Sequence, residues 1–396
     1  MKKKSKMLGL LISICLMLSV LAGCGANSEA NNEQAGSDTG KSYKLAFFGP
    51  LSGDAMQYGV AIKDAVELEI KKVNDEGGIN GVPVELKVFD DKNDPKESVN
   101  IANKIVSDPE ILVAIGSFSS SCSLAAAPVF QKNQVPLFSP TASHPDFPFA
   151  GDYMFTLAMT QKLESKKFAE FVIDQFGQKK VATIYQNTDY GVTANEIFVN
   201  RIKELGGEVT GSEQFISGQT KDYSPLISKI KAQQPDIFYV IGTYSEAAQI
   251  IQQAKALDLK AQYIGNGQLI REDFLKLVGA NGEGLVVMSS IPVFLSSTLK
   301  NQTLDAKTET FVTDFKNAYQ AEADGFSAMG YDSASLIVNA ILKAGDDKKG
   351  IRDALAQTKE YAGVSGNLSF MDTREVERSL INYRIKDGTF IPYVRE

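Results

Sequence analysis

The sequence predicts an α/β fold with two Rossmann-like lobes, each built on a parallel sheet. From Tyr43 onward, short apolar runs of strand length alternate with amphipathic stretches of helix length, and this alternation is typical of α/β proteins. Two such sets follow each other along the chain. The roughly 350 residues from Tyr43 to the end also exceed what one hydrophobic core usually holds. We therefore expect two lobes.

The elements of the first set can be assigned in order. Residues 43–50, "YKLAFFGP", predict a strand that ends in a Gly-Pro turn, and the helical spacing of apolar residues over 57–74 predicts a helix. Asp94 and Pro95 are the expected N-cap and first residue of the next helix, 94–108. The other elements expected here are strands at 82–91, 111–117, 135–140 and 153–160 and a helix over roughly 121–131.

The second set repeats the pattern and is followed by a mostly helical region. Its expected strands are 179–187, 207–215, 236–244 and 261–267, and its expected helices are 191–205, 223–232 and 245–256. Helical patterns then cover 305–344 and 351–357, and residues 379–394 close the chain with a strand-like pattern.

The first 23 residues are predicted to be a lipoprotein signal peptide. Four lysines precede an apolar stretch from Met7 to Leu21, as in secretory signals. The ending "LAGC" resembles a bacterial lipoprotein cleavage site, which implies lipid on Cys24; a retained membrane anchor is the alternative. Residues 24–42 contain no large apolar side chain, so they predict a disordered tether. The body is expected outside the cytoplasm, anchored to the cell membrane by the N-terminal lipid.

Charge and cysteine content narrow the possible partners. Without the four signal lysines the formal net charge would be −11 instead of −7, and no block of basic residues remains, which argues against nucleic acid. Cys15 would leave with the signal and Cys24 would carry lipid, so Cys122 has no cysteine to pair with. Core burial must then stabilise the protein, which we expect to be a monomer.

The sequence argues against an enzyme, a metal site and a cofactor. The single histidine, His144, could in principle serve Ser120 as a base, but "GSFSSSC" lacks the G-x-S-x-G elbow of serine hydrolases. No phosphate-binding glycine motif follows a predicted strand. One histidine and one mature thiol cannot supply a zinc site, and "DDKNDPKE" lacks the spacing of a calcium loop.

Hydroxyl groups gather on the predicted strand-to-helix turns, where parallel sheets bind ligands. Helix capping would explain one serine but not the whole group, so we expect a carboxylate ligand held by neutral donors. The group comprises Ser117, Ser119, Ser120 and Ser121, with Thr141 and Ser143 on the next turn. Tyr58, Tyr190 and Tyr244 also lie on such turns and are candidate pocket walls, with core packing as the alternative for tyrosine. For Phe118 and Phe326 the two alternatives stay open.

Three motifs resemble the solute-binding proteins of branched-chain amino acid ABC transporters, the leucine/isoleucine/valine-binding family with the type 1 periplasmic binding fold. They are "FFGPLSGDAMQYG", "NDEGGINGVPVELKVFDDKNDPKESVNIANKIVSD" and "IGSFSSSCSLAAAP". The resemblance implies three hinge crossings, near Leu157, Ser290 and Phe370. It would place residues 43–157 and 291–370 in the first lobe and residues 158–290 and 371–396 in the second.

The resemblance also implies roles for individual residues. Ser120, with Ser143 and the backbone around Thr141, would hold the polar ends of an amino acid in the first lobe, and Ser119 is a further candidate ligand-binding residue. The side-chain pocket would be shaped by Tyr58, Phe118, Ala142 and Phe326, and the second lobe would close over the ligand with Tyr190 and Tyr244.

Two positions depart from the family pattern. Asn93 and Ser119 stand where the relatives have a disulfide, so hydrogen bonds must order the serine loop. Gly267 stands where the family has the glutamate that receives the ligand's ammonium. Either another acid reaches the ligand, with Asp189 and Glu246 as candidates, or the ligand is not an ordinary α-amino acid.

The expected function is therefore ligand capture for an ABC importer. The ligand would be an amino acid, leucine-like or aromatic, or a related small carboxylate, and ABC permease subunits would be the partners. A sensory receptor of the same architecture, which signals to a membrane partner on closure, is the alternative.

Overall fold

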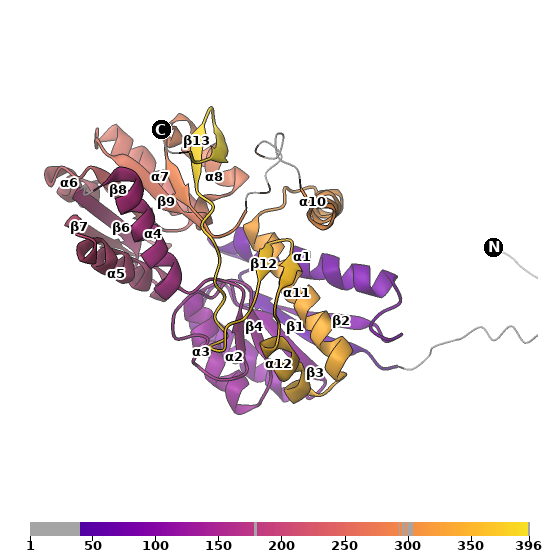
Figure 1. The fold of residues 1–396 in the computed structure, drawn as a ribbon. Helices are drawn as coiled ribbons and strands as arrows, with labels where there is room; N and C mark the ends of the chain where they lie inside the picture. Colours follow the sequence, from indigo (N-terminus) through magenta and orange to yellow (C-terminus); the bar gives the residue numbers. More distant parts are fainter. Residues whose placement is uncertain (1–39, 178–179, 293, 295–297, 299–303, 395–396) are drawn as a thin grey trace, which may run out of the picture. The chain divides into compact units, whose positions relative to one another are not determined.

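A computed structural model describes residues 40–177, 180–292, 294, 298 and 304–394 (Figure 1). The predicted signal peptide, Cys24 and most of the predicted tether lie outside these residues. Within the described part of the chain, no helix combines the length and the apolar character needed to span a membrane.

The first lobe contains a parallel sheet with the strand order β2-β1-β3-β4-β5. Its strands are β1 (Tyr43–Gly49), β2 (Val84–Asp90), β3 (Ile111–Gly116), β4 (Leu137–Ser139) and β5 (Met154–Thr156). Each lies within a predicted strand. Long apolar runs such as β3, which is buried throughout, are typical of parallel sheets covered on both faces.

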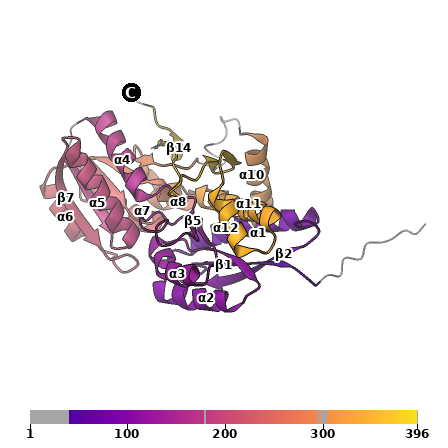
Figure 2. The same ribbon diagram turned by 60° about the horizontal axis from the view of Figure 1, so that its bottom comes forward.

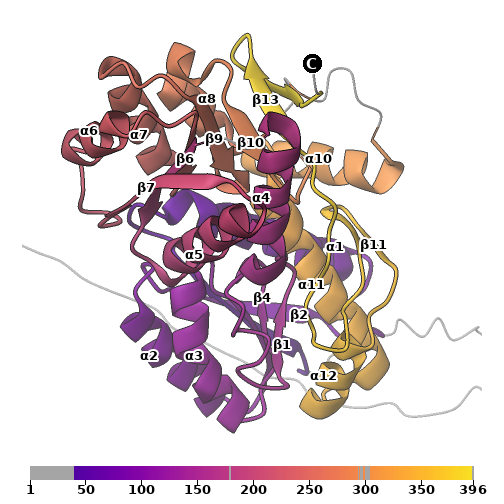
Figure 3. The same cartoon turned by 60° about the vertical axis from the view of Figure 1, so that its left-hand side comes forward.

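Helices cover both faces of this sheet because successive side chains of a strand point to opposite faces. Leu45 and Phe47 pack on the face that carries α1 (Met56–Asp75) and α11 (Gly325–Ala344). Ala46 and Phe48 pack on the face that carries α2 (Pro95–Ser107) and α3 (Ser120–Lys132). Figures 1 and 3 show α1 and α11 side by side, although more than 200 residues separate them in the sequence.

The expected first helices form, and α2 has its predicted start signal. The carboxylate of Asp94 caps α2 by accepting hydrogen bonds from the amides of Lys96 and Glu97, and Pro95 is the first helical residue. The side chain of Ser119 caps α3 through the amide of Cys122.

The second lobe contains a mixed sheet with the strand order β14-β13-β10-β9-β8-β6-β7. Its parallel strands are β6 (Lys180–Gln186), β7 (Glu208–Phe215), β8 (Ile237–Ile241), β9 (Gln262–Asn266) and β10 (Val286–Met288). The strand-like end of the sequence is an antiparallel hairpin, β13 (Tyr383–Lys386) and β14 (Thr389–Pro392). Asp387 and Gly388 join these strands with φ angles of 51° and 71°, as a tight hairpin requires. The predicted two-lobe α/β fold is confirmed.

The helices around this sheet include two, α4 and α8, that the sequence pattern did not assign. The predicted helices correspond to α5 (Asp189–Glu204), α6 (Ser224–Ala232) and α7 (Tyr244–Ala256). The short elements η1 (Gly267–Leu269), α8 (Glu272–Val278) and η2 (Gly279–Gly282) connect β9 to β10. The longer of the two unassigned helices is α4 (Gln161–Phe176), which lies beside α5 in Figure 2.

The helical region after residue 304 is divided. One continuous pattern over 305–344 forms α10 (Ala306–Tyr319) and α11, because Gln320 ends α10 in the left-handed region at φ 54° and Asp324 caps the start of α11. The chain continues through α12 (Lys348–Ala356) and the small hairpin of β11 (Tyr361–Gly363) and β12 (Gly366–Leu368).

Candidate functional site

The serine-rich turn between β3 and α3 is tied to the turn that follows β4. The hydroxyl oxygen of Ser120 accepts hydrogen bonds from the amides of Ser143 and His144, both at 3.2 Å. Ser120 and Ser143 are 3% and 5% exposed. Because Ser120 accepts these bonds, its own hydroxyl hydrogen remains available to a ligand. The amides of the first turn of α3 also lack partners within the helix, as at every helix start.

A buried carboxylate supports this turn from beneath. Asp91 accepts hydrogen bonds from the hydroxyls of Ser117 at 2.6 Å and Ser98 at 3.1 Å, and from the amide of Asn93 at 2.9 Å. Burial raises the pKa of Asp91, although these three donors act in the opposite direction. Through Asp91, the loops that carry Asn93 and Ser117 are thus joined by hydrogen bonds.

Neither the histidine nor the cysteine of this region is placed for nucleophilic chemistry. The ring nitrogen Nδ1 of His144 accepts a hydrogen bond from the amide of Asp146 at 3.2 Å, and only the backbone of His144 contacts Ser120. Cys122 is fully buried, and burial raises the pKa of its thiol to about 12, so it stays protonated. The described residues contain no group of His, Cys, Asp and Glu side chains that could hold a metal ion.

A cleft lies where several helices begin. The starts of α3, α5 and α7, capped by Ser119, Thr188 and Thr243, all line it. Of the predicted site residues, Phe118, Ser119, Ser120, Thr141, Ser143, Tyr190 and Phe326 line the cleft. Converging helix starts carry partial positive charge and unpaired amides, and this environment favours an anion.

The two lobes contact each other beside this cleft. The amide of Asp189 at the start of α5 donates to the hydroxyl of Ser121 at 3.4 Å. Arg271 of the second lobe forms a buried ion pair with Asp324 at the start of α11. Arg271 also lies over the ring of Tyr58, 5.1 Å from its centre.

The predicted aromatic residues form a stack of which only part faces the cleft. Tyr58 stacks on Phe118 with ring centres 4.4 Å apart, and Phe326 meets Tyr58 edge-on at 4.8 Å. The Tyr58 hydroxyl donates to the carbonyl of Gln268 and accepts from the amide of Tyr244. Among the residues that the structure describes, Tyr58 and Tyr244 do not line the cleft. They also do not line the second cavity, which adjoins the cleft and is described below. Tyr58 thus stands behind Phe118 and Phe326.

Ala142 is also set back from the cleft. Its amide donates to the hydroxyl of Ser139 and its carbonyl accepts from the hydroxyl of Thr156. Ala142 is fully buried. Within the described structure it lines neither the cleft nor the cavity that adjoins the cleft. Ala142 therefore positions the turn that carries Thr141 and Ser143.

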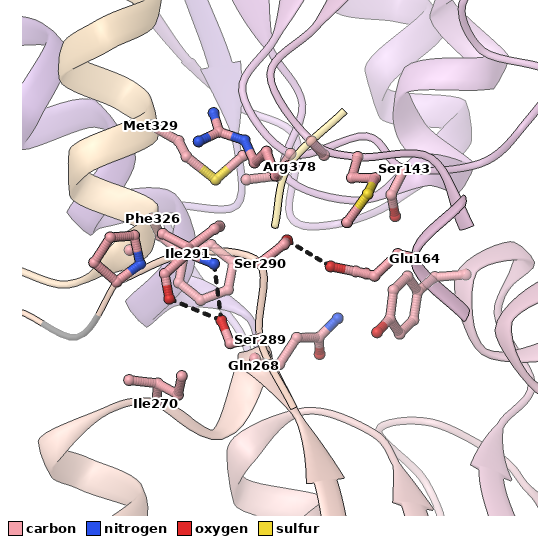
Figure 4. A pocket seen from close by; sticks show the side chains of 17 residues that line it. Ser143, Glu164, Gln268, Ile270, Ser289, Ser290, Ile291, Phe326, Met329 and Arg378 are labelled. Carbon is pink, nitrogen blue, oxygen red and sulfur yellow. Dashed lines mark hydrogen bonds between the residues drawn. The ribbon is translucent and has the colours of Figure 1, made fainter. Parts of the chain in front are cut away.

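A deeper cavity of about 80 Å³ adjoins the cleft (Figure 4). The two share the lining residues Thr141, Ser143, Tyr190, Gln268 and Phe326. The deep cavity adds Met159 and Glu164 from around the start of α4, Ser289 and Ser290 after β10, Met329 of α11, and Arg378. Gly267 lines it as well, and a Cβ atom there would lie 3.0 Å from the hydroxyl oxygen of Ser289.

Glu164 is the acid that reaches this cavity, and the sequence analysis missed it. It lies in the first turn of α4, where its Oε1 accepts a hydrogen bond of 2.6 Å from the Ser290 hydroxyl. Burial raises the pKa of Glu164 to about 7, although Ser290 and the charge of Arg378 oppose the shift. No signal in its local sequence marks it, because its importance depends on the position of α4 against β10.

The two acids that the sequence suggested are placed differently. Glu246 belongs to the capping box of α7 and accepts from the Ser217 hydroxyl and the Gly218 amide, both at 2.9 Å. Asp189 lines the cleft but not the deep cavity. The carboxylate of Glu246 is therefore already hydrogen-bonded to residues of the second lobe.

Comparisons with known proteins agree with this architecture. The family described as Periplasmic binding protein matches residues 42–389. The Leu/Ile/Val-binding protein homolog 1 of Brucella suis is 28% identical over 324 residues, which cover 81% of this chain and 84% of that protein.

Two solved structures are similar along nearly their whole length. The branched-chain amino acid transporter substrate binding protein LivJ from Streptococcus pneumoniae, in complex with isoleucine, has 25% identity and a TM-score of 0.80, covering 88% of this chain and 98% of that one. A solute binding protein of an ABC transporter from R. palustris, in complex with benzoate, has 20% identity and a TM-score of 0.79, covering 89% and 95%. This second likeness concerns the fold. An amino acid and an aromatic carboxylate are thus both ligands of proteins with this fold.

Proposed function

Because the chain belongs to the periplasmic binding protein family, we propose that it is the extracytoplasmic substrate-binding protein of an ABC importer. Its ligand is an amino acid or a related small carboxylate. The observation that carries the proposal is the convergence of the Ser120 and Ser143 turns with the starts of α3, α5 and α7 on one cleft. These neutral donors suit a carboxylate without an arginine.

The ligand would be held between two lobes that close over it. The proposed boundaries assign residues 43–157 and 291–370 to the first lobe and residues 158–290 and 371–396 to the second, with crossings near Leu157, Ser290 and Phe370. Support comes from contacts beside the crossings: Arg378 donates to the carbonyl of Leu157, and Ser290 donates to Glu164. Closure would be favoured by ligand contacts that both lobes make at once.

Delivery to a permease requires the protein to stay at the membrane. We propose that lipid on Cys24 supplies this anchor, that the tether spaces the lobes from the bilayer, and that a monomer docks on the permease subunits. Metabolic labelling with a radioactive fatty acid tests the anchor. Label should be incorporated by the wild-type protein and lost in Cys24→Ala, whereas equal labelling of both would contradict lipidation.

Ser120 provides the test of the carboxylate site. Ser120→Ala removes a charge-assisted hydrogen bond and should weaken binding by roughly 1.5 to 3 kcal/mol, or about 10- to 150-fold. Isothermal titration calorimetry with leucine, isoleucine and benzoate measures the change. Ser228→Ala is the control, because the Ser228 hydroxyl bonds only to the Ser224 carbonyl on the exposed side of α6. Equal affinity of wild type and Ser120→Ala would remove Ser120 from the site.

A further inference from the structure

We propose that the deep cavity receives an ammonium group of the ligand and that Glu164 is the carboxylate that pairs with it. The ligand is then an amino carboxylate rather than a plain carboxylic acid. This inference rests on the proposed carboxylate site at Ser120 and adds the opposite end of the same molecule.

Glu164 forms no ion pair among the described residues, although the charge of Arg378 acts on it from a distance. The Ser290 hydroxyl donates to its Oε1, but no lysine or arginine of the described residues forms an ion pair with it. A carboxylate that is partly removed from water and has no counter-charge is unfavourable, by as much as several kcal/mol where burial is complete. A cationic ligand group would supply the missing charge at the point where Glu164 lines the cavity.

Arg378 does not fill this role, although it lines the same cavity. Its guanidinium donates to the carbonyls of Leu157 and Ser365 and to the Ser365 hydroxyl. Figure 4 shows this guanidinium turned away from Glu164, whereas the Glu164 carboxylate points toward Ser290 at the cavity wall. Arg378 is thus a structural cation bound to backbone.

A second acceptor lies in the same cavity. The side-chain oxygen Oε1 of Gln268 is buried and has no hydrogen-bond partner among the described residues, and Figure 4 shows Gln268 across the cavity below Glu164. An ammonium carries donors only, so it can satisfy both Glu164 and Gln268. The cavity volume of about 80 Å³ leaves room for such a group, because it is several times the roughly 10 to 15 Å³ that a cavity needs to hold one water.

The carboxylate and ammonium sites are close enough to serve one small molecule. Ser143 lines both the cleft and the deep cavity, and its amide bonds directly to Ser120. The ammonium can come from an α-amino acid or from an amino acid with its amine at the end of the chain. The same carboxyl group would recognise the ammonium in both cases. The experiment distinguishes the two kinds of ligand by including one example of each.

The experiment compares each amino carboxylate with its deaminated partner by isothermal titration calorimetry at pH 8.5. The pairs are leucine with 4-methyl-2-oxopentanoate and 4-aminobutanoate with butanoate. Wild-type full-length protein should bind one of the two amino ligands at least about tenfold more tightly than its partner. Glu164→Gln should lower the affinity for that amino ligand by about tenfold or more and leave the deaminated partner unchanged within about threefold.

Matched variants separate pairing from folding. Glu170→Gln makes the same change on the same helix, where the carboxylate pairs with Arg201 at the surface, so binding should be unchanged. Glu164→Asp keeps the charge and withdraws it by one methylene, so it should retain part of the preference for the amino ligand even if Glu164→Gln folds poorly.

Three outcomes would overturn the proposal. One is tighter binding of the deaminated acids or of benzoate by the wild type, which would leave the carboxylate-binding function standing. The second is an equal loss for both members of a pair in both Glu164 variants, which would assign Glu164 a purely structural role. If the wild type binds none of these carboxylates, the proposed function fails as well.

Discussion

The two ends of the candidate site are built in opposite ways. At the serine turn, hydroxyls and amides bond to one another, and Ser120 accepts from Ser143 and His144 while Asp91 fixes the loop from beneath. In the deep cavity, the Glu164 carboxyl group accepts a hydrogen bond from Ser290 and forms no ion pair among the described residues. One end offers the ligand neutral hydrogen-bond donors, and the other offers it an ionisable carboxyl group.

This difference in construction determines how each end of the site behaves in the ligand-free protein. Neutral donors remain satisfied by one another or by water, so the serine turn keeps its geometry at little cost. A poorly solvated cavity instead disfavours the charged form of a carboxyl group, until a cation binds beside it. Substitutions in the serine turn should therefore lower the stability of the fold. Substitutions in the deep cavity should instead change how stability and ligand binding depend on pH.

Asp91→Ala should have the largest effect and would break the serine turn. The substitution leaves the Ser117 hydroxyl and the Asn93 amide without their acceptor, whereas the Ser98 hydroxyl keeps the Asp94 carbonyl at 3.0 Å. We expect the free energy of unfolding to fall by about 3 kcal/mol, because each unpaired buried donor costs about 1 to 3 kcal/mol and relief of the buried charge offsets part of this. Urea denaturation followed by circular dichroism measures the change.

Asp91→Asn is the matched control for charge. Its side-chain oxygen can still accept from the Asn93 amide, and the serine hydroxyls can rotate toward its amide group. We expect less than half of the loss seen for Asp91→Ala. An equal loss in both variants would mean that the charge of Asp91, rather than its acceptor geometry, orders the loop.

The serine turn could be predicted because its information is local. "GSFSSSC" follows an apolar run of strand length and precedes an alanine-rich helix, so Ser119 and Ser120 had to lie at a strand-to-helix turn. The family resemblance drawn from the same motifs is confirmed by the match over residues 42–389. The placement of Phe118 and Tyr190 beside this turn follows from the same rule, because their turns lie at the carboxyl ends of strands.

The rest of the site depends on contacts between distant segments. Glu164 gains its role because α4 brings it to Ser290, 126 residues away, and no periodic pattern encodes that distance. Tyr58 was expected as a pocket wall, but the structure places it behind Phe118 and Phe326 through its bonds to Gln268 and Tyr244. Which ring of a stack faces the ligand is decided by packing that local sequence does not show.

Glu164→Gln should sharpen the comparison through the stability of the ligand-free protein. Burial raises the pKa of Glu164 to about 7, whereas an unfolded glutamate titrates near about 4.3. Between these values the folded protein binds the extra proton, so the wild type loses stability as the pH rises through this window. The variant avoids the loss and should be more stable above pH 7 by about 2 kcal/mol, a figure reduced for the partial exposure of the side chain.

Thermal unfolding at pH 4 and pH 8 tests this expectation. The two proteins should unfold alike at pH 4, and the variant should have the higher Tm at pH 8. The neighbouring titratable groups do not interfere, because arginine stays protonated and burial raises the pKa of Tyr190. A variant that is less stable than the wild type at pH 8 would show that ionised Glu164 is already well compensated.

Ser290→Ala should have the smallest effect and tests whether the two ends are independent. The Ser290 hydroxyl stabilises the ionised form of Glu164 and so lowers its pKa against the effect of burial. Without this hydroxyl the pKa rises further, so binding of an amino carboxylate at pH 7 should weaken by about 1 kcal/mol. The loss should shrink at pH 9, where Glu164 is ionised in both proteins, and the deaminated acid should bind equally to both at either pH. Calorimetry at the two pH values measures this, and a loss shared by the deaminated acid would mean that Ser290 also supports the carboxylate end.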